Sequence, residues 1–133
     1  LLLNRPYCLS NIVIHGKKLG RKLGYPTANL NIDSKYVIPA NGIYYTNVKV
    51  KDKIYKGITS VGTNPTVESK GLSIETFILD FNEEIYGEEI TIFFTKRIRD
   101  EIKFNSLEDL SKRLSLDEIF AEKEEIHPYL MKN

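Results

Sequence analysis

A short segment near the start of the chain combines glycines and cations in a way that suits phosphate chemistry. Residues 16–24 hold three glycines, Gly16, Gly20 and Gly24, and four cations, among them Arg21. Glycines let backbone amides approach phosphate oxygens, and cationic side chains neutralise their charge. The segment lacks the Gly-Lys-Ser/Thr ending of a Walker A loop and the spacing of a dinucleotide fingerprint. Its composition alone favours an ordinary solvated loop, because basic loops with glycine are common.

The next five residues, Tyr25-Pro26-Thr27-Ala28-Asn29, carry two oxygen-bearing side chains at alternate positions. Pro26 fixes its own φ and favours an extended Tyr25. In an extended chain, Thr27 and Asn29 point to the same side. A hydroxyl and an amide oxygen suit Mg²⁺, which usually takes one or two protein oxygens together with substrate phosphates. A turn explains the same residue types, so beside the basic segment the two interpretations have equal support.

A carboxylate interrupts the apolar face of a predicted strand. Alternation over residues 72–81 places Glu75 on the same face as Phe77, Leu79 and Phe81. Burial among apolar side chains disfavours the charged form of a carboxyl group, which makes it a better proton acceptor near neutral pH. A position at the strand end, where the side chain reaches solvent or an arginine, is an equally weighted alternative.

Residues 97–104 alternate charged with apolar side chains between the predicted last strand and the first helix. Such a junction could hold an anionic or planar ligand. Residues of this kind mostly form surface ion pairs, however, which contribute less than about 1 kcal/mol each. Taken alone, the junction is therefore interpreted as structural.

The overall composition excludes several classes of protein. The 133 residues carry 19 Lys and Arg against 18 Asp and Glu, a net charge of +1, whereas nucleic-acid-binding domains are strongly basic. No apolar run approaches the roughly 18 residues that a membrane-spanning helix needs. The single cysteine, Cys8, excludes an intrachain disulfide and a Cys-rich zinc site. Sparing use of cysteine suits a reducing compartment, and we expect the protein to be cytoplasmic.

The candidate side chains need a scaffold, and the first two thirds of the chain are rich in strand-forming residues. Lys51 and Asp52 mark a hairpin between two of the predicted strands. Strands at such regular spacing indicate a small antiparallel barrel or sandwich. We expect strands at residues 9–15, 43–50, 53–61, 72–81 and 88–95.

Helices follow the strands. Ser106, with Asp109 three residues later, is typical of a helix start. A second helix is expected over residues 117–126, so the domain is assigned to the α+β class, mainly β. The acidic side chains of this part are interpreted as a solvated helix face; they are Asp117, Glu118, Glu122, Glu124 and Glu125.

Taken in order along the chain, these features resemble the motifs of the riboflavin kinase family. The match runs along almost the whole chain, and the ordered set is far more specific than any one motif. The motifs are Gly16…Gly20-Arg21…Gly24-Tyr25-Pro26-Thr27-Ala28-Asn29, Pro39…Gly42-Ile43-Tyr44, Val61-Gly62-Thr63-Asn64-Pro65-Thr66, Ile74-Glu75-Thr76, Asp80-Phe81, Tyr86-Gly87, Arg99…Glu101…Phe104 and Ser106…Leu110.

The resemblance implies a fold and a domain layout. The fold would be a six-stranded antiparallel Greek-key barrel with a C-terminal helix packed beside it. Residues 1–133 would form one kinase domain. Within it, residues 1–8 would belong to an interdomain junction, residues 9–95 to the barrel, and residues 96–133 to a flavin-side segment with the C-terminal helices.

The resemblance also implies an activity and its residues. The reaction would be ATP-dependent phosphorylation of the riboflavin ribityl 5′-hydroxyl, which gives FMN and ADP. Glu75 would be the catalytic carboxylate, and Thr27 and Asn29 would hold Mg²⁺ with the nucleotide phosphates. ATP would be bound by Gly16, Gly20, Arg21, Gly24, Thr27 and Asn29, and the flavin by Arg99, Glu101 and Phe104.

In bacteria this kinase is commonly fused to an FMN adenylyltransferase module, so the parent protein is expected to make both FMN and FAD. This chain would then make FMN alone. Two departures stand out, because the basic segment is less glycine-rich than in many relatives and Phe77 stands where a His is common. The rivals are a barrel that binds single-stranded nucleic acid and a non-catalytic flavin-binding module. Near-zero net charge opposes the first, and the joint presence of Thr27, Asn29 and Glu75 opposes the second.

Overall fold

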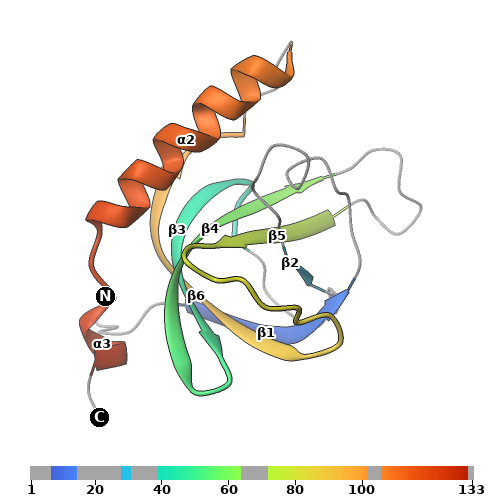
Figure 1. Ribbon diagram of the computed structural model, residues 1–133, viewed down its shortest axis with the longest axis vertical. Coiled ribbons are helices and arrows are strands. Elements are labelled where there is room, and N and C mark those ends of the chain that lie inside the picture. Colours follow the sequence, from blue (N-terminus) through green and yellow to red (C-terminus); the bar gives the residue numbers. More distant parts are fainter. Residues whose placement is uncertain (1–6, 15–27, 31–38, 64–71, 102–105, 132–133) are drawn as a thin grey trace.

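Six antiparallel strands close into a barrel, and one long helix lies along its side (Figure 1). The structure, a computed structural model, describes residues 7–14, 28–30, 39–63, 72–101 and 106–131. No described helix is long and apolar enough to cross a membrane. The strands are β1 (Tyr7–Ile14), β2 (Ala28–Leu30), β3 (Gly42–Val50), β4 (Lys53–Thr63), β5 (Leu72–Ile78) and β6 (Glu89–Arg99), and the helices are α2 (Leu107–Lys123) and α3 (Pro128–Met131).

The strand order around the barrel is β1-β2-β5-β4-β3-β6. Strands β3, β4 and β5 are consecutive neighbours, and β6 returns beside β3, which is the Greek-key arrangement. The predicted barrel is therefore confirmed. The β3–β4 hairpin turns at Lys51 and Asp52, whose φ angles are 52° and 81°. Two positive φ values in a row give the turn a twist that matches the flanking strands, so the predicted hairpin is also confirmed.

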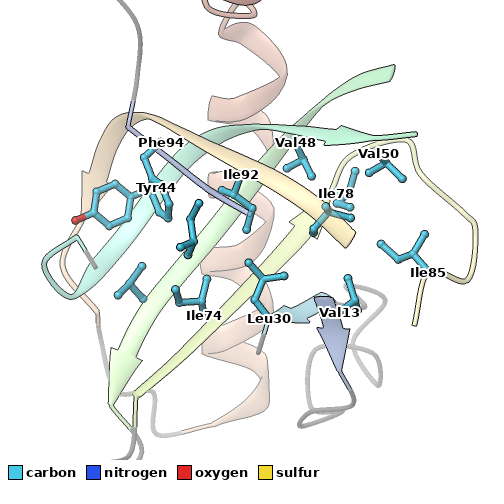
Figure 2. Packing of buried hydrophobic residues seen from close by; sticks show 13 residues of the cluster. Val13, Leu30, Tyr44, Val48, Val50, Ile74, Ile78, Ile85, Ile92 and Phe94 are labelled. Carbon is cyan, nitrogen blue, oxygen red and sulfur yellow. The ribbon is translucent and has the colours of Figure 1, made fainter. Parts of the chain in front are cut away.

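The barrel interior is filled by aliphatic and aromatic side chains that converge from all six strands (Figure 2). Three threonines lie among them, all fully buried. Thr59 Oγ1 lies 2.9 Å from Thr46 Oγ1 and 2.8 Å from Thr76 Oγ1, so one hydroxyl chain links β3, β4 and β5. A buried hydroxyl costs free energy unless it is hydrogen-bonded. The threonines therefore favour one register of these strands.

A second apolar cluster lies on the outer face of the barrel, beneath α2. Ala121 of the helix is fully buried there. Because this cluster covers the outer face, β3 is buried on both faces over most of its length. Its members are Ile43, Tyr45, Ile58, Leu79 and Ala121, with Phe77, Ile98 and Phe120 packed against them.

The helix begins as predicted but continues further. Ser106 is the N-cap, and its side chain accepts a hydrogen bond from the Asp109 amide. The expected second helix over residues 117–126 is wrong, because α2 runs without a break to Lys123. No glycine or proline interrupts the sequence from 107 to 123, so nothing stops the helix where a boundary was predicted.

Two strand ends also differ from expectation. The last strand extends to Arg99, because β3 offers it a pairing partner as far as Ile43. Strand β5 stops at Ile78, and Asp80 adopts a φ of 55° in the turn that follows. Phe81 therefore packs against the interior cluster, not on the outer face with Phe77 as predicted.

Candidate functional site

Three polar side chains form a row across the outer face of the barrel. In the strand register, Glu75 of β5 is paired with Asn29 of β2 on one side and with Ser60 of β4 on the other. Residues paired directly across antiparallel strands share a face, with Cβ atoms about 5 Å apart. All three residues are half-buried. The fold thus brings a carboxylate, an amide and a hydroxyl together from three strands.

The surroundings of Glu75 follow from strand alternation. Ile74, Thr76 and Ile78 point into the barrel, so Glu75 and Phe77 point outward. Phe77 packs against the outer cluster beneath α2. Glu75 therefore lies in the middle of the row and beside the apolar surface that Phe77 provides, and the predicted face is confirmed for Glu75, Phe77 and Leu79.

The row continues on its other side to Arg99. Ser60 pairs with Ile43 of β3, and Ile43 pairs with Arg99 at the end of β6. Two register shifts interrupt the β3–β6 pairing, between Ile43 and Tyr44 and between Tyr45 and Thr46. Each such shift changes the face on which the following residues lie, so the two shifts cancel. Arg99 therefore lies on the outer face with its partner Ile43, where its side chain reaches α2.

Each of the three nitrogens of the Arg99 guanidinium donates a hydrogen bond to a protein oxygen. Its Nε donates to Asp117 Oδ1 at 3.2 Å and its Nη2 to Asp117 Oδ2 at 2.6 Å. Its Nη1 donates to the Asp100 carbonyl oxygen at 3.1 Å. The side chains are 9% and 2% exposed, so Arg99 and Asp117 form a buried ion pair between β6 and α2.

Asp117 contradicts the prediction of a solvated acidic face. Besides Arg99, the Nε of Arg113 lies 3.6 Å from Asp117 Oδ1. Two arginines thus neutralise one buried carboxylate, which is the condition under which a charge can be buried. The helical spacing of Leu110, Leu114, Asp117 and Ala121 would have placed Asp117 on the buried face. This helical spacing is visible in the sequence when Asp117 is taken apart from the neighbouring acidic residues.

Glu101 is exposed, but its carboxylate lies against the barrel. A Cβ atom added at Gly62 of β4 would collide with the Glu101 carboxylate. Gly62 lies two residues beyond Ser60 and so presents the same outer face. Among the described residues, no hydrogen-bond donor reaches the Glu101 carboxylate. The sequence motifs included Gly62, but nothing in them indicated that its missing side chain makes room for Glu101.

Arg97, near the end of β6, contacts both Asn41, which precedes β3, and Asp100. Its Nη2 donates to the Asn41 carbonyl oxygen at 2.7 Å and lies 2.8 Å from Asp100 Oδ1. The hydrogen bond to Asp100 raises the pKa of Arg97 above its ordinary value. Arg97 and Arg99 therefore hold Asp100 from both sides, by its carboxylate and by its carbonyl.

The remaining predicted site residues lie outside the part of the chain that the structure describes. They are Gly16, Gly20, Arg21, Gly24, Thr27 and Phe104. Of the predicted set, the described residues are Asn29, Glu75, Arg99 and Glu101. The fold pairs Asn29 directly with Glu75, and it holds Glu101 over the strand next to Glu75.

This arrangement supports a limited set of reactions. A half-buried carboxylate next to an amide and a hydroxyl can accept a proton from a bound alcohol. No cluster of three or more His, Cys, Asp or Glu residues is present within the described ranges. Of the predicted metal ligands, Asn29 is described, and its amide oxygen is a hard ligand that fits Mg²⁺ shared with a ligand's phosphates.

Known proteins share sequence and fold with this chain. The family model described as riboflavin kinase matches residues 3–124. The chain belongs to the riboflavin kinase family. It is 41% identical over 120 residues to the bifunctional riboflavin kinase/FMN adenylyltransferase of Bacillus subtilis. The match covers 88% of this chain but 38% of that protein, so the chain spans well under half the length of this relative.

Two solved structures share the fold of this riboflavin kinase family member. A crystal structure of riboflavin kinase from Trypanosoma brucei matches with a TM-score of 0.64 at 25% identity, over 89% of this chain and 78% of that one. A Streptococcus pneumoniae structure named a macrolide-efflux protein matches with a TM-score of 0.84 at 37% identity, over 90% of this chain and 40% of that one. That name refers to a different activity, and the likeness shows a shared fold.

Proposed function

We propose that this chain transfers the γ-phosphoryl group of ATP to the 5′-hydroxyl of the riboflavin ribityl chain, forming FMN and ADP. The observation that carries the proposal is the Asn29–Glu75–Ser60 row on the outer face of the barrel, in a chain whose family model is riboflavin kinase. Phosphoryl transfer depends mainly on alignment and charge neutralisation, and a row of rigid strand residues suits alignment.

Glu75 is proposed as the general base. As the ribityl oxygen bonds to the γ-phosphorus, the bond between that phosphorus and the bridging oxygen of ADP breaks. The hydroxyl proton moves to the Glu75 carboxylate, which later returns it to solvent. Ser60 and Asn29 flank the carboxylate in the register, and they are proposed to orient it through hydrogen bonds.

The nucleotide side of the site is proposed to include Asn29. Its amide oxygen and the Thr27 hydroxyl would hold Mg²⁺, which neutralises phosphate charge when bound. Gly16, Gly20, Arg21 and Gly24 are proposed to contact the phosphates of ATP through backbone amides and the Arg21 cation. The position of Asn29 beside Glu75 supports this proposal.

The flavin side is proposed to lie toward Glu101 and Phe104. Glu101 supports this assignment because its carboxylate lies on the same outer face as Glu75, one strand away. Arg99 is proposed to act on the flavin side through the residues it holds, since all three of its nitrogens already donate to protein oxygens.

The parent protein is proposed to carry an FMN adenylyltransferase module, because the Bacillus subtilis relative is bifunctional and much longer. On this proposal, residues 1–8 form the junction, residues 9–95 the barrel and residues 96–133 the flavin-side segment with its helix. We propose a cytoplasmic location, where ATP is available.

The direct test is incubation of the purified chain with riboflavin, ATP and Mg²⁺, followed by chromatography of the flavin. We expect FMN and ADP in equal amounts, and no FAD. Omission of ATP is the control for FMN that co-purifies. Riboflavin binding without FMN formation would support the non-catalytic flavin-binding module, and binding of single-stranded DNA without flavin binding would support the nucleic-acid-binding barrel.

A further inference from the structure

A continuous set of contacts leads from the middle of α2 to the outer face of the barrel. Asp117 holds the Arg99 guanidinium through two hydrogen bonds. The third nitrogen of that guanidinium holds the Asp100 carbonyl oxygen. The next residue is Glu101, whose carboxylate lies against Gly62. Every link of this set involves described residues. Its far end lies over Gly62, on the same face of β4 as Ser60, which is the partner of Glu75.

The geometry of Arg99 explains why this set is rigid. A guanidinium that binds both oxygens of a carboxylate is fixed in its plane as well as in position. Its remaining nitrogen therefore points in a fixed direction, and here it meets the carbonyl group of the adjacent residue. Arg97 holds the carboxylate of Asp100 at 2.8 Å. The chain thus leaves β6 in one direction only.

Among the described residues, the contact of the Glu101 carboxylate is with the space above Gly62. Its position there depends on where the backbone leaves β6. A displacement of Asp100 would be transmitted directly to Glu101.

We propose that Asp117 is a positioning residue for the flavin side of the site, and that it acts through Arg99 and Asp100 to fix the Glu101 carboxylate over Gly62. This inference rests on the proposed function, because it assumes that Glu101 contacts the flavin. A purely structural role for Asp117 would instead stabilise the packing of α2 without affecting substrate binding.

The test compares three variants of the full chain. Asp117→Asn removes the charge that holds Arg99. Arg99→Lys keeps an ion pair with Asp117 but loses the planar guanidinium and its bond to the Asp100 carbonyl. Glu124→Gln is the matched control, because Glu124, the C-cap of α2, also joins the helix to β6, through Lys96 at 3.2 Å, but away from Arg99 and Asp100. Melting temperatures are recorded first, and kinetics are measured well below the lowest of them.

We expect Asp117→Asn and Arg99→Lys to raise the KM for riboflavin by about 10-fold, because a positioning error of about 1 Å costs up to about 100-fold. The KM for ATP should change by less than about 2-fold, and kcat should fall less than the KM for riboflavin rises. Glu124→Gln should leave both KM values unchanged even where it lowers the melting temperature. Wild-type KM values in both test variants would overturn the inference.

A double-mutant cycle with Glu101→Gln separates action through Glu101 from any other route. We expect Asp117→Asn to change the KM for riboflavin by less than about 2-fold when Glu101 is already Gln. Equal effects in both backgrounds would overturn the inference. If Asp117→Asn does not fold, the same cycle with Arg99→Lys decides in the same way.

The proposed function is judged separately, by the wild-type chain. If the wild type forms FMN while the cycle is additive, the inference fails alone. If the wild type forms no FMN, both fail.

Discussion

At the residue scale, Glu75 is the proposed general base. Glu75→Gln keeps the shape of the side chain but removes the proton acceptor. A general base typically contributes about 10²–10⁴-fold, so we expect kcat to fall by that factor while binding of ATP and riboflavin changes little. Single-turnover FMN formation and separate ligand titrations measure the two effects. Glu89→Gln, at an exposed position on β6, is the control, and a near-normal rate for Glu75→Gln would show that Glu75 is not the base.

The proposed metal site leads to a separate prediction for Asn29. Asn29→Ala removes the proposed oxygen ligand next to Glu75 without disturbing the barrel interior. We expect the Mg²⁺ concentration for half-maximal activity to rise by about 10-fold or more, since a divalent cation here has few protein ligands. A magnesium titration of initial rates measures it. An unchanged magnesium requirement would mean that the metal is held elsewhere.

The close approach of Glu101 to Gly62 leads to a prediction about the melting temperature. A side chain there would collide with the Glu101 carboxylate, so Gly62→Ala should lower the melting temperature slightly, because the group that must move is the end of an exposed side chain. Adding Glu101→Ala to that variant should restore most of the loss, because the colliding group is gone. Thermal unfolding of the two single variants and the double variant checks this. If the double variant were no more stable than Gly62→Ala, the collision would not be the cause.

At the scale of elements, β3 ties the C-terminal segment to the barrel. Asn47 is fully buried. Its Oδ1 accepts from the His127 amide at 2.9 Å, and its Nδ2 donates to the Tyr45 hydroxyl at 3.0 Å. The Tyr45 hydroxyl in turn donates to the Glu125 carbonyl oxygen at 3.0 Å. Two side chains of one strand thus hold the residues that follow α2.

We expect Asn47→Leu to destabilise the fold by about 1–3 kcal/mol, because it leaves a buried amide without its acceptor. Urea unfolding measures the loss. Hydrogen exchange should become faster first at the His127 amide, which loses its acceptor directly. Unchanged exchange at that amide would show that Asn47 does not hold the segment.

The elements also show what the sequence can and cannot predict. Alternation located five strands and put Glu75 on the outer face, since period two is visible in any run of seven or more residues. Strand β2 has three residues, too few for a period, so Asn29 was noted only as part of a motif. The two register shifts between β3 and β6 leave no compositional trace. The burial of Asp117 depends on two arginines from different elements.

At the scale of the whole molecule, alkaline pH should reveal the contact between barrel and C-terminal segment. Burial raises the pKa of Tyr45. A group whose pKa is higher in the folded state stabilises the fold below its unfolded pKa, which is about 10 for tyrosine. That stabilisation is lost as the pH rises through the folded-state value.

We therefore expect the free energy of unfolding to fall above pH of about 10, and to fall less steeply in Tyr45→Phe. Tyr86→Phe is the control, because Tyr86 is 54% exposed. Denaturant unfolding between neutral pH and about pH 11 gives the three curves. Identical slopes in Tyr45→Phe and the wild type would remove Tyr45 as the source.

The short strand β2 has a consequence for how the protein would respond to its proposed substrates. Within the described part of the chain, its two residue pairs with β1 and two with β5 are the fewest between neighbouring strands, and one of the paired residues is Asn29. A ligand that bridged Asn29 and Glu75, as the proposed function implies, would stabilise this pairing by mass action. The fraction of molecules with these strands separated would then fall as substrate rises, so bound enzyme would resist proteolysis better than free enzyme.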